Sequence, residues 1–163
     1  MFNKILVGID HSTISRKVFE TGLSLAKTTG GSLMLLHVLS PSEKIYPSPF
    51  IYYGRASEPR DESIVNVYQQ HWQKLEQSGL ELLQSLAEEA TQAGVKTEWE
   101  QSLGYPGRNI CSSAQTWSAD LILVGSRGLT GLKEMFLGSI SNYVTHHAPC
   151  SVLIVREETD EVL

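Results

Sequence analysis

Short apolar runs that alternate with helical patterns constrain the fold of this chain more than any other feature. KILVGI at residues 4–9 and SLMLLHVL at 32–39 are runs of the kind expected for strands buried on both faces of a sheet. Between them, residues 16–31 carry an apolar stripe at helical spacing that ends at two glycines. Ser12 or Thr13 can cap the start of this helix. The three segments together predict a strand–helix–strand unit.

The same alternation continues to the C-terminus. The pattern predicts a long amphipathic helix from about Val67 to Ala93. Beyond it we expect strands at 96–103, 120–125 and 151–155, and helices at about 108–117 and 139–147. This order predicts an α/β fold with one open parallel sheet and helices on both faces. We expect a single domain over residues 1–157 and an acidic tail at 158–163.

One irregular segment interrupts the pattern at residues 40–65. It holds four of the six prolines and three of the six tyrosines of the chain, without sustained periodicity. These features predict a loop or lid. Its tyrosines at 46, 52 and 53 could stack on a base, but anchoring of the loop is the favoured interpretation.

Composition disfavours several classes of partner. The 13 Lys and Arg against 18 Asp and Glu give a net charge of -5, and no basic run marks a nucleic-acid footprint. Cys111 and Cys150 have neither disulfide-framework nor zinc-ribbon spacing, which favours a reducing cytoplasm. The N-terminal apolar run is too short for a signal peptide, and no segment approaches the ~18 apolar residues of a membrane span. We therefore expect a soluble cytoplasmic protein without nucleic-acid or membrane partners.

The most unusual stretch is GSRGLTGLKEMFLGSISNYV, residues 125–144, at the end of the fourth predicted strand. Ligands of open α/β sheets bind beyond the carboxyl ends of the strands. Gly125, Gly128 and Gly138 would let the backbone approach an anion closely or adopt positive φ, so that successive N–H groups form an anion nest. Ser139 is a good N-cap for a helix over 140–147, whose positive end would point at the same anion. The spacing matches neither the P-loop nor the GxGxxG fingerprint.

Several of these residues have structural alternatives. The glycines at 125 and 128 could simply turn the chain. Asp10 could cap the first helix, contact a ligand, or do both. Arg127 could touch a phosphate or be an exposed loop arginine.

A metal site is a further alternative near the C-terminus. His146, His147 and Cys150 suggest one, but adjacent histidines point two ways and Cys150 begins a strand expected to be buried. We favour histidines that complement the helix dipole and a core thiol. The three tryptophans are interpreted as packing residues: Trp72, Trp99 and Trp117.

At these motifs the chain resembles the universal stress protein family in its ATP-binding branch. The resemblance extends over nearly the whole chain and rests on ILVGIDHS, LLHV, GYPG, ADLILVGSRG and GSISNYVTHHAPCSVLIV. It implies a Rossmann-like fold, similar to that of the adenine nucleotide alpha hydrolases, with sheet order 3-2-1-4-5. It also implies a cytoplasmic ATP-binding domain, usually a homodimer paired through the last strand, Ser151 to Val155.

The resemblance implies a particular nucleotide site. Asp10 would contact the ribose or a phosphate-bound Mg²⁺ ion, with Gly8 beside it, and the backbone of Val38 would meet the adenine edge. No other residue is expected to approach the metal, which would be held through the phosphates. The remaining residues expected around the nucleotide are Val124, Gly125, Arg127, Gly128, Gly138, Ser139, Ile140 and Ser141.

Three function classes remain open. The leading one is a nucleotide-dependent regulatory or stress-response protein with an unidentified protein partner. Hydrolysis should be slow at most, because the 125–141 loop offers hydroxyls, Arg127, Lys133 and Glu134 but no obvious base. An adenylyl-transfer enzyme on a related fold is the second class, disfavoured because we identify no acceptor domain. A non-binding dimeric interaction module is the third.

A homodimer is also expected from sheet geometry. A final strand at the edge of a parallel sheet presents unpaired backbone groups, which pairing across a two-fold axis would satisfy. Val152 and Ile154 would face such a join.

Overall fold

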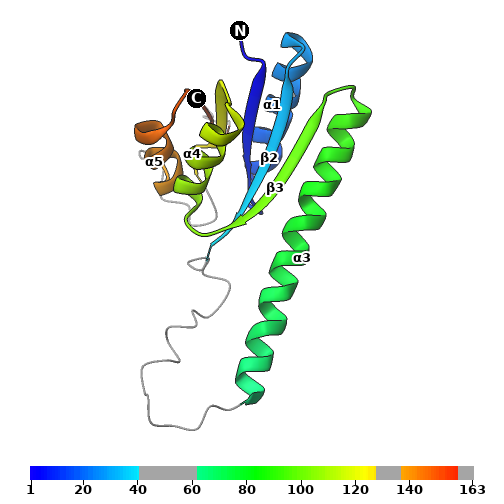
Figure 1. Cartoon of the computed structure of the whole chain (residues 1–163), viewed down its shortest axis with the longest axis vertical. Helices are drawn as coiled ribbons and strands as arrows, with labels where there is room; N and C mark the ends of the chain where they lie inside the picture. Colours follow the sequence, from blue (N-terminus) through cyan, green and yellow to red (C-terminus); the bar gives the residue numbers. More distant parts are fainter. Residues whose placement is uncertain (41–61, 128–136, 158–163) are drawn as a thin grey trace, which may run out of the picture.

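Five parallel strands form one sheet in this computed structural model, which describes residues 1–40, 62–127 and 137–157 (Figure 1). The strands run in the order β3-β2-β1-β4-β5, which confirms the predicted topology. Their bounds are β1 (Lys4–Ile9), β2 (Ser32–Leu39), β3 (Thr97–Leu103), β4 (Leu121–Gly125) and β5 (Ser151–Val155). Of the predicted loop at 40–65, residues 41–61 lie outside the described residues, and residues 62–65 are helical, so the end of the loop was placed too late. The predicted tail at 158–163 lies entirely outside the described residues.

Helices cover both faces of the sheet, as predicted. Their bounds are α1 (Ser15–Thr29), α3 (Glu62–Gln92), α4 (Pro106–Trp117) and α5 (Ser139–His147). One buried cluster joins β1 and β2 to α1 and α3, and includes Val7, Phe19, Leu33 and Leu83. A second cluster joins the opposite face to α4 and α5 through Ile110, Ala114 and Val144. Figure 1 shows α4 and α5 on one side of the strands and the long α3 on the other.

Two predicted helix caps are wrong. The residue before α1 is Ile14, without a side-chain cap bond, because Ser12 lies in a preceding turn and its hydroxyl bonds Asp10 instead. The residue before α5 is Gly138, so Ser139 is the first helical residue and not the cap. The predicted stop of α1 is confirmed: Gly30 has φ 70°, and its N–H donates to the carbonyl of Ala26.

Two helices begin earlier than predicted. α3 begins at Glu62 and not near Val67. Its first two turns carry β-branched residues, which have low helix propensity, and two of them, Val65 and Val67, are exposed, so the early start was not recognised. Figure 1 shows this end of α3 running well past the ends of the strands. α4 begins at Pro106, whose fixed φ and missing N–H suit the first helical position. None of the helices within the described residues is long and apolar enough to cross a membrane.

One tryptophan departs from its expected packing role. Trp99 lies on the edge strand β3 and is 42% exposed, because no further strand covers it. Trp72 and Trp117 are partly buried, and Trp117 packs against the cluster under α4.

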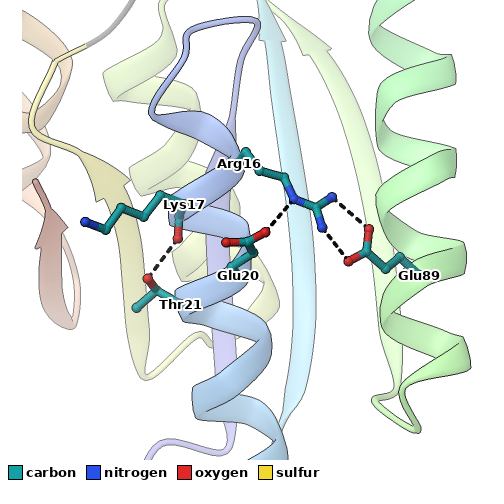
Figure 2. Close-up of polar contacts among 5 residues, drawn as sticks. All are labelled: Arg16, Lys17, Glu20, Thr21 and Glu89. Carbon is teal, nitrogen blue, oxygen red and sulfur yellow. Dashed lines mark hydrogen bonds and ion pairs between the residues drawn. The ribbon is translucent and has the colours of Figure 1, made fainter. Parts of the chain in front are cut away.

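A polar clamp joins the two helices on the α1–α3 face (Figure 2). The Arg16 guanidinium donates to Glu20 of its own helix at 2.8 Å, and to both carboxylate oxygens of Glu89 in α3 at 2.7 and 2.8 Å. Hydrogen bonding from Arg16 holds the pKa of Glu89 below its usual value. Nearby, the Thr21 hydroxyl donates to the Lys17 carbonyl. The clamp therefore links α1 to the C-terminal half of α3.

Candidate functional site

The strand order reverses at β1, which lies between β2 and β4. Ile9 pairs with His37 on one side, and Val7 pairs with Leu123 on the other. The chain leaves β1 through α1 toward β2, whereas β4 is reached through α4 on the opposite face. Such a reversal is where open α/β sheets bind ligands, beyond the carboxyl ends of the strands.

Asp10 follows β1 at this edge and shapes the next turn. Its Oδ1 accepts a hydrogen bond from the Ser12 N–H at 2.8 Å and another from the Ser12 hydroxyl. The Asp10 N–H donates to the Ser15 hydroxyl at 3.0 Å. Asp10 therefore makes an Asx-type turn and does not cap α1, and the partly buried carboxylate is fixed at the end of the strand.

Backbone hydrogen bonds bring the start of α5 to the end of β4. The Ser126 N–H donates to the Val155 carbonyl at 2.8 Å, and the Gly138 N–H donates to the Ser126 carbonyl at 2.7 Å. The buried Ser141 hydroxyl lies 3.0 Å from the Gly138 carbonyl and 3.2 Å from the Ser126 carbonyl. Ser141 thus holds the two ends of the loop together through its hydroxyl. Gly128 lies outside the described residues.

The first turn of α5 carries no capping side chain. The first helical hydrogen bond runs from the Asn142 N–H to the Gly138 carbonyl at 2.9 Å. The N–H groups of residues 139–141 precede it and have no partner inside the helix. With the positive end of the helix dipole, these amides form the kind of arrangement that binds anions. Ser139 is exposed and Ile140 is partly buried.

Two glycines at this edge leave little room for a side chain. A Cβ on Gly125 would lie 2.8 Å from Ile14 Cγ2, and one on Gly8 would lie 3.3 Å from Val124 Cγ1. Gly125 is not among the positive-φ residues, and Gly138 has φ −58°. The positive-φ alternative is therefore wrong for these two glycines, and close approach of the backbone remains.

The valines expected beside a nucleotide have buried side chains. Val38 and Val124 are 6% and 3% exposed, and both belong to the cluster under α4 and α5. Only their backbone is placed to meet a ligand at the edge. Arg127 is partly exposed and is the last described residue before the gap.

Sequence reasoning missed His37 as a buried polar residue at the same edge. Its Nδ1 lies 2.8 Å from Gln101 Oε1, and its ring meets the exposed His11 edge to face at 5.5 Å. Among the described residues, its buried Nε2 has no hydrogen-bond partner. Burial is the main cause that lowers the pKa of His37, opposed by the Gln101 contact. The one signal was a histidine inside an otherwise apolar strand.

The metal alternative near the C-terminus gains no support. His146 and His147 are exposed, and the His147 ring stacks on Tyr143 at 4.0 Å. Cys150 packs against the α4–α5 cluster, and burial raises the pKa of its thiol. Within the described part of the chain, no group of three or more His, Cys, Asp or Glu residues could hold a metal ion.

The fold and this edge define a class: an open doubly wound α/β domain whose loops at the point of strand reversal present backbone amides and a fixed carboxylate. The chain belongs to the universal stress protein family, because the model of that family matches residues 1–156. It is 37% identical over 158 residues to universal stress protein Sll1388 of a Synechocystis strain, with 95% of this chain and 98% of that protein covered.

Solved structures share the fold. The hypothetical protein MJ0577 superposes with a TM-score of 0.79 at 22% identity, covering 98% of this chain and 99% of that one. A universal stress protein family protein from Arabidopsis thaliana, solved with AMP bound, gives a TM-score of 0.62 at 24% identity, covering 99% and 96%. At these identities the structural similarity establishes the fold alone. The bound AMP is a finding on the Arabidopsis protein.

Proposed function

We propose that this protein binds ATP with Mg²⁺ at the carboxyl edge of its sheet and acts as a nucleotide-dependent regulator in stress responses. The observation that carries the proposal is the bond from the Gly138 N–H to the Ser126 carbonyl, which brings the uncapped start of α5 to the end of β4. This arrangement suits a phosphate group, because consecutive amides can each donate to a different oxygen, and we propose that the phosphates are those of ATP. The AMP-bound relative supports an adenine nucleotide.

Each site residue has a proposed role. The amides of residues 139–141 would donate to phosphate oxygens, and Gly128 and Arg127 would complete the phosphate side. The Asp10 carboxylate would meet the ribose or the phosphate-bound Mg²⁺ ion, beside Gly8. The adenine edge and the rest of the nucleotide would lie against the backbone of three residues: Val38, Val124 and Gly125.

Regulation is favoured over catalysis because the described residues on the proposed phosphate side, 125–127 and 137–142, include no histidine or carboxylate that could act as a general base. Phosphoryl transfer needs a group that positions or activates the nucleophile. The Asp10 carboxylate is engaged in its turn, and the Ser141 hydroxyl is buried against backbone carbonyls. We therefore propose that any ATP hydrolysis is slow. A steady-state rate of roughly 1 per second or faster would contradict this.

A homodimer through β5 is part of the proposal. β5 lies at one edge of the sheet, so one side of its backbone is unpaired within the described chain. Val152 and Ile154 pack against the α4–α5 cluster, whereas Leu153 is 38% exposed. Leu153 is therefore the β5 side chain best placed to contact a second copy. Sedimentation that shows only monomer at micromolar concentration would contradict the dimer.

Calorimetric titration of Mg-ATP into the protein and into Gly138→Val tests the nucleotide site. The backbone of Gly138, with φ −58° and ψ 160°, is open to a branched residue, so the variant should fold while its side chain crowds the phosphate position. We expect micromolar binding by the wild type and at least a tenfold loss in the variant, or about 1.4 kcal/mol.

His146→Gln is the matched control, because His146 is exposed in the last turn of the same helix. Its affinity should equal that of the wild type. If the wild type, folded and free of co-purified nucleotide, binds neither ATP nor AMP, the nucleotide proposal is wrong. The non-binding dimeric interaction module then becomes the favoured function class. Exchange of labelled pyrophosphate into ATP would instead support adenylyl transfer.

A further inference from the structure

Helix α3 passes over the sheet at His37, where Gly79 of the helix lies against His37 and Gln101 of the strands. We call this contact the crossing. His37 lies near the carboxyl end of β2, and its side chain faces α3, where Gly79 comes directly over the ring. A Cβ on Gly79 would lie 2.6 Å from His37 Nδ1 and 2.8 Å from Cε1. The close approach of helix and sheet at this point therefore depends on glycine.

The hydrogen bonds at the crossing indicate which ring nitrogen carries the proton. Gln101 Nε2 donates to the Glu76 carbonyl of α3 at 2.9 Å, which leaves Gln101 Oε1 as the acceptor toward His37. His37 Nδ1 must then be the donor, and the neutral ring holds its lone pair on Nε2. That Nε2 is buried and has no partner within the described residues. A second proton would therefore enter a buried position with no acceptor provided for it.

The charges near His37 come from one loop. His11 and Asp10, between β1 and α1, act on it in opposite directions, and the His11 ring contacts the His37 ring directly. The residues that face it from β3 and α3, Gln101 and Gly79, carry no charge. Glu76 reaches the network through its backbone carbonyl, and its side chain is exposed.

We propose that His37 makes the carboxyl edge acid-sensitive: a proton taken up at Nε2 loosens the crossing of α3 at Gly79 and displaces the adjoining Asp10–His11 loop. Because Asp10 belongs to the proposed nucleotide site, acid would also weaken nucleotide binding; this second consequence rests on the proposed function. His37 is a positioning residue in this scheme and touches no ligand itself.

The direction and window of the effect follow from linkage. Burial lowers the pKa of His37 in the folded protein below its ordinary value of 6.5. Its neutral form therefore contributes stability that is fully present above about pH 6.5 and is lost as pH falls through the folded-state pKa. Between about pH 6.5 and that pKa, the ratio of ordered to opened crossing should fall by up to about tenfold for each pH unit.

Amide hydrogen exchange of the full chain tests the crossing without any nucleotide. Protection of α3 amides around Gly79, corrected for intrinsic exchange, is measured between about pH 7.5 and about pH 5 in wild type, His37→Gln and His146→Gln. Wild type and His146→Gln should lose at least about tenfold protection at the acid end, and His37→Gln should lose none. Equal acid loss in wild type and His37→Gln, or no loss in wild type, overturns the proposal.

A second variant tests the proposal even if His37→Gln does not fold. His11 is exposed, so His11→Gln should fold, and removing the coulombic effect by which His11 lowers the pKa of His37 should move the exchange midpoint of the crossing to higher pH. If the midpoint of the exchange transition does not move, or moves to lower pH, the proposed role of His37 is contradicted.

Mg-ATP titrations over the same pH series test the second consequence. Affinity should fall more steeply with acid in wild type than in His37→Gln, and protonation of the ATP phosphates cancels in this comparison. Parallel affinity profiles would overturn the link from His37 to the nucleotide. If the wild type binds no nucleotide even at neutral pH, the proposed function fails, while hydrogen exchange still decides whether His37 is acid-sensitive.

Discussion

The polar groups at the two ends of the parallel strands are bonded in different ways. We call the end where the strands begin the amino edge, and the end where they finish the carboxyl edge. At the amino edge, the Asp120 carboxylate accepts from the Asn3 N–H at 2.8 Å and from the Lys4 N–H at 3.2 Å. The Asp120 N–H donates back to the Lys4 carbonyl at 2.9 Å, and the Ser32 N–H donates to the Asn3 carbonyl at 2.8 Å. The Lys4 ammonium lies 4.5 Å from the centre of the Trp117 ring. These contacts fasten β1 to its neighbours.

At the carboxyl edge, polar groups remain available among the described residues. The first turn of α5 lacks a side-chain cap, and His37 Nε2 is buried without a partner. Both would be costly to leave unsatisfied in a domain selected for stability alone. The comparison supports the proposal that the carboxyl edge binds a nucleotide, whereas the amino edge serves stability.

The largest effect is expected where α3 crosses the carboxyl edge. Gly79→Val should lower the free energy of unfolding by about 3 kcal/mol, because the new side chain overlaps Gln101 Oε1 and crowds His37. Urea unfolding measures this change. Ser78→Val places the same side chain at the exposed neighbouring position and should cost no more than about 0.5 kcal/mol beyond the propensity of valine. Equal losses in the two variants would show that the helix, and not the crossing, is sensitive.

Substitutions of Asp120 at the amino edge should lower the free energy of unfolding without lowering nucleotide affinity. Asp120→Ala leaves the Asn3 and Lys4 amides without their carboxylate partner and should cost about 2 kcal/mol in urea unfolding. Asp120→Asn keeps one acceptor oxygen and should cost less. Nucleotide affinity should be unchanged in both variants. A loss of affinity as large as that of a carboxyl-edge variant would break the contrast between the two edges.

Asp10→Ala should show the opposite pattern. We expect about a tenfold loss of Mg-ATP affinity, equivalent to about 1.4 kcal/mol. The unfolding free energy should fall by less, about 1 kcal/mol, because the lost contacts belong to one short turn. Asp10→Asn keeps an acceptor for the Ser12 amide but removes the charge. It should therefore retain stability while it weakens binding, and unchanged affinity in both variants would remove Asp10 from the site.

The sequence predicted the elements whose pattern is locally complete. β1, β2, β5 and α5 have the predicted bounds, because a continuous apolar run or a helix bounded by Gly138 and a proline at 149 needs no distant information. The start of α3 was placed too late, because its first turns carry exposed β-branched residues of low helix propensity. The predicted cap of α1 failed because the Ser12 hydroxyl has a competing partner and bonds Asp10.

The candidate site was predictable only in part. The parallel topology alone brings Asp10, Gly125 and the start of α5 to one edge. The role of His37 was not predictable, because it depends on Gln101 and Gly79, which come from elements remote in sequence. The ligand contacts of the site residues stay predictions, and Gly128 lies outside the described residues.

The smallest effect concerns the Arg16–Glu89 clamp between α1 and α3 (Figure 2). Both side chains are more than a third exposed, so a double-mutant cycle with Arg16→Met and Glu89→Gln should give a coupling of only about 0.2–1 kcal/mol. Hydrogen bonding from Arg16 lowers the pKa of Glu89 below its ordinary value of 4.5. The coupling should therefore be present above about pH 4.5 and be lost as pH falls through the folded-state pKa. The acid response of His37 begins at higher pH, so the coupling should persist where that response starts. If the Arg16–Glu89 coupling disappears near pH 6, the clamp depends on the protonation of His37. The exposed ion pair and the carboxyl edge would then not respond to acid independently.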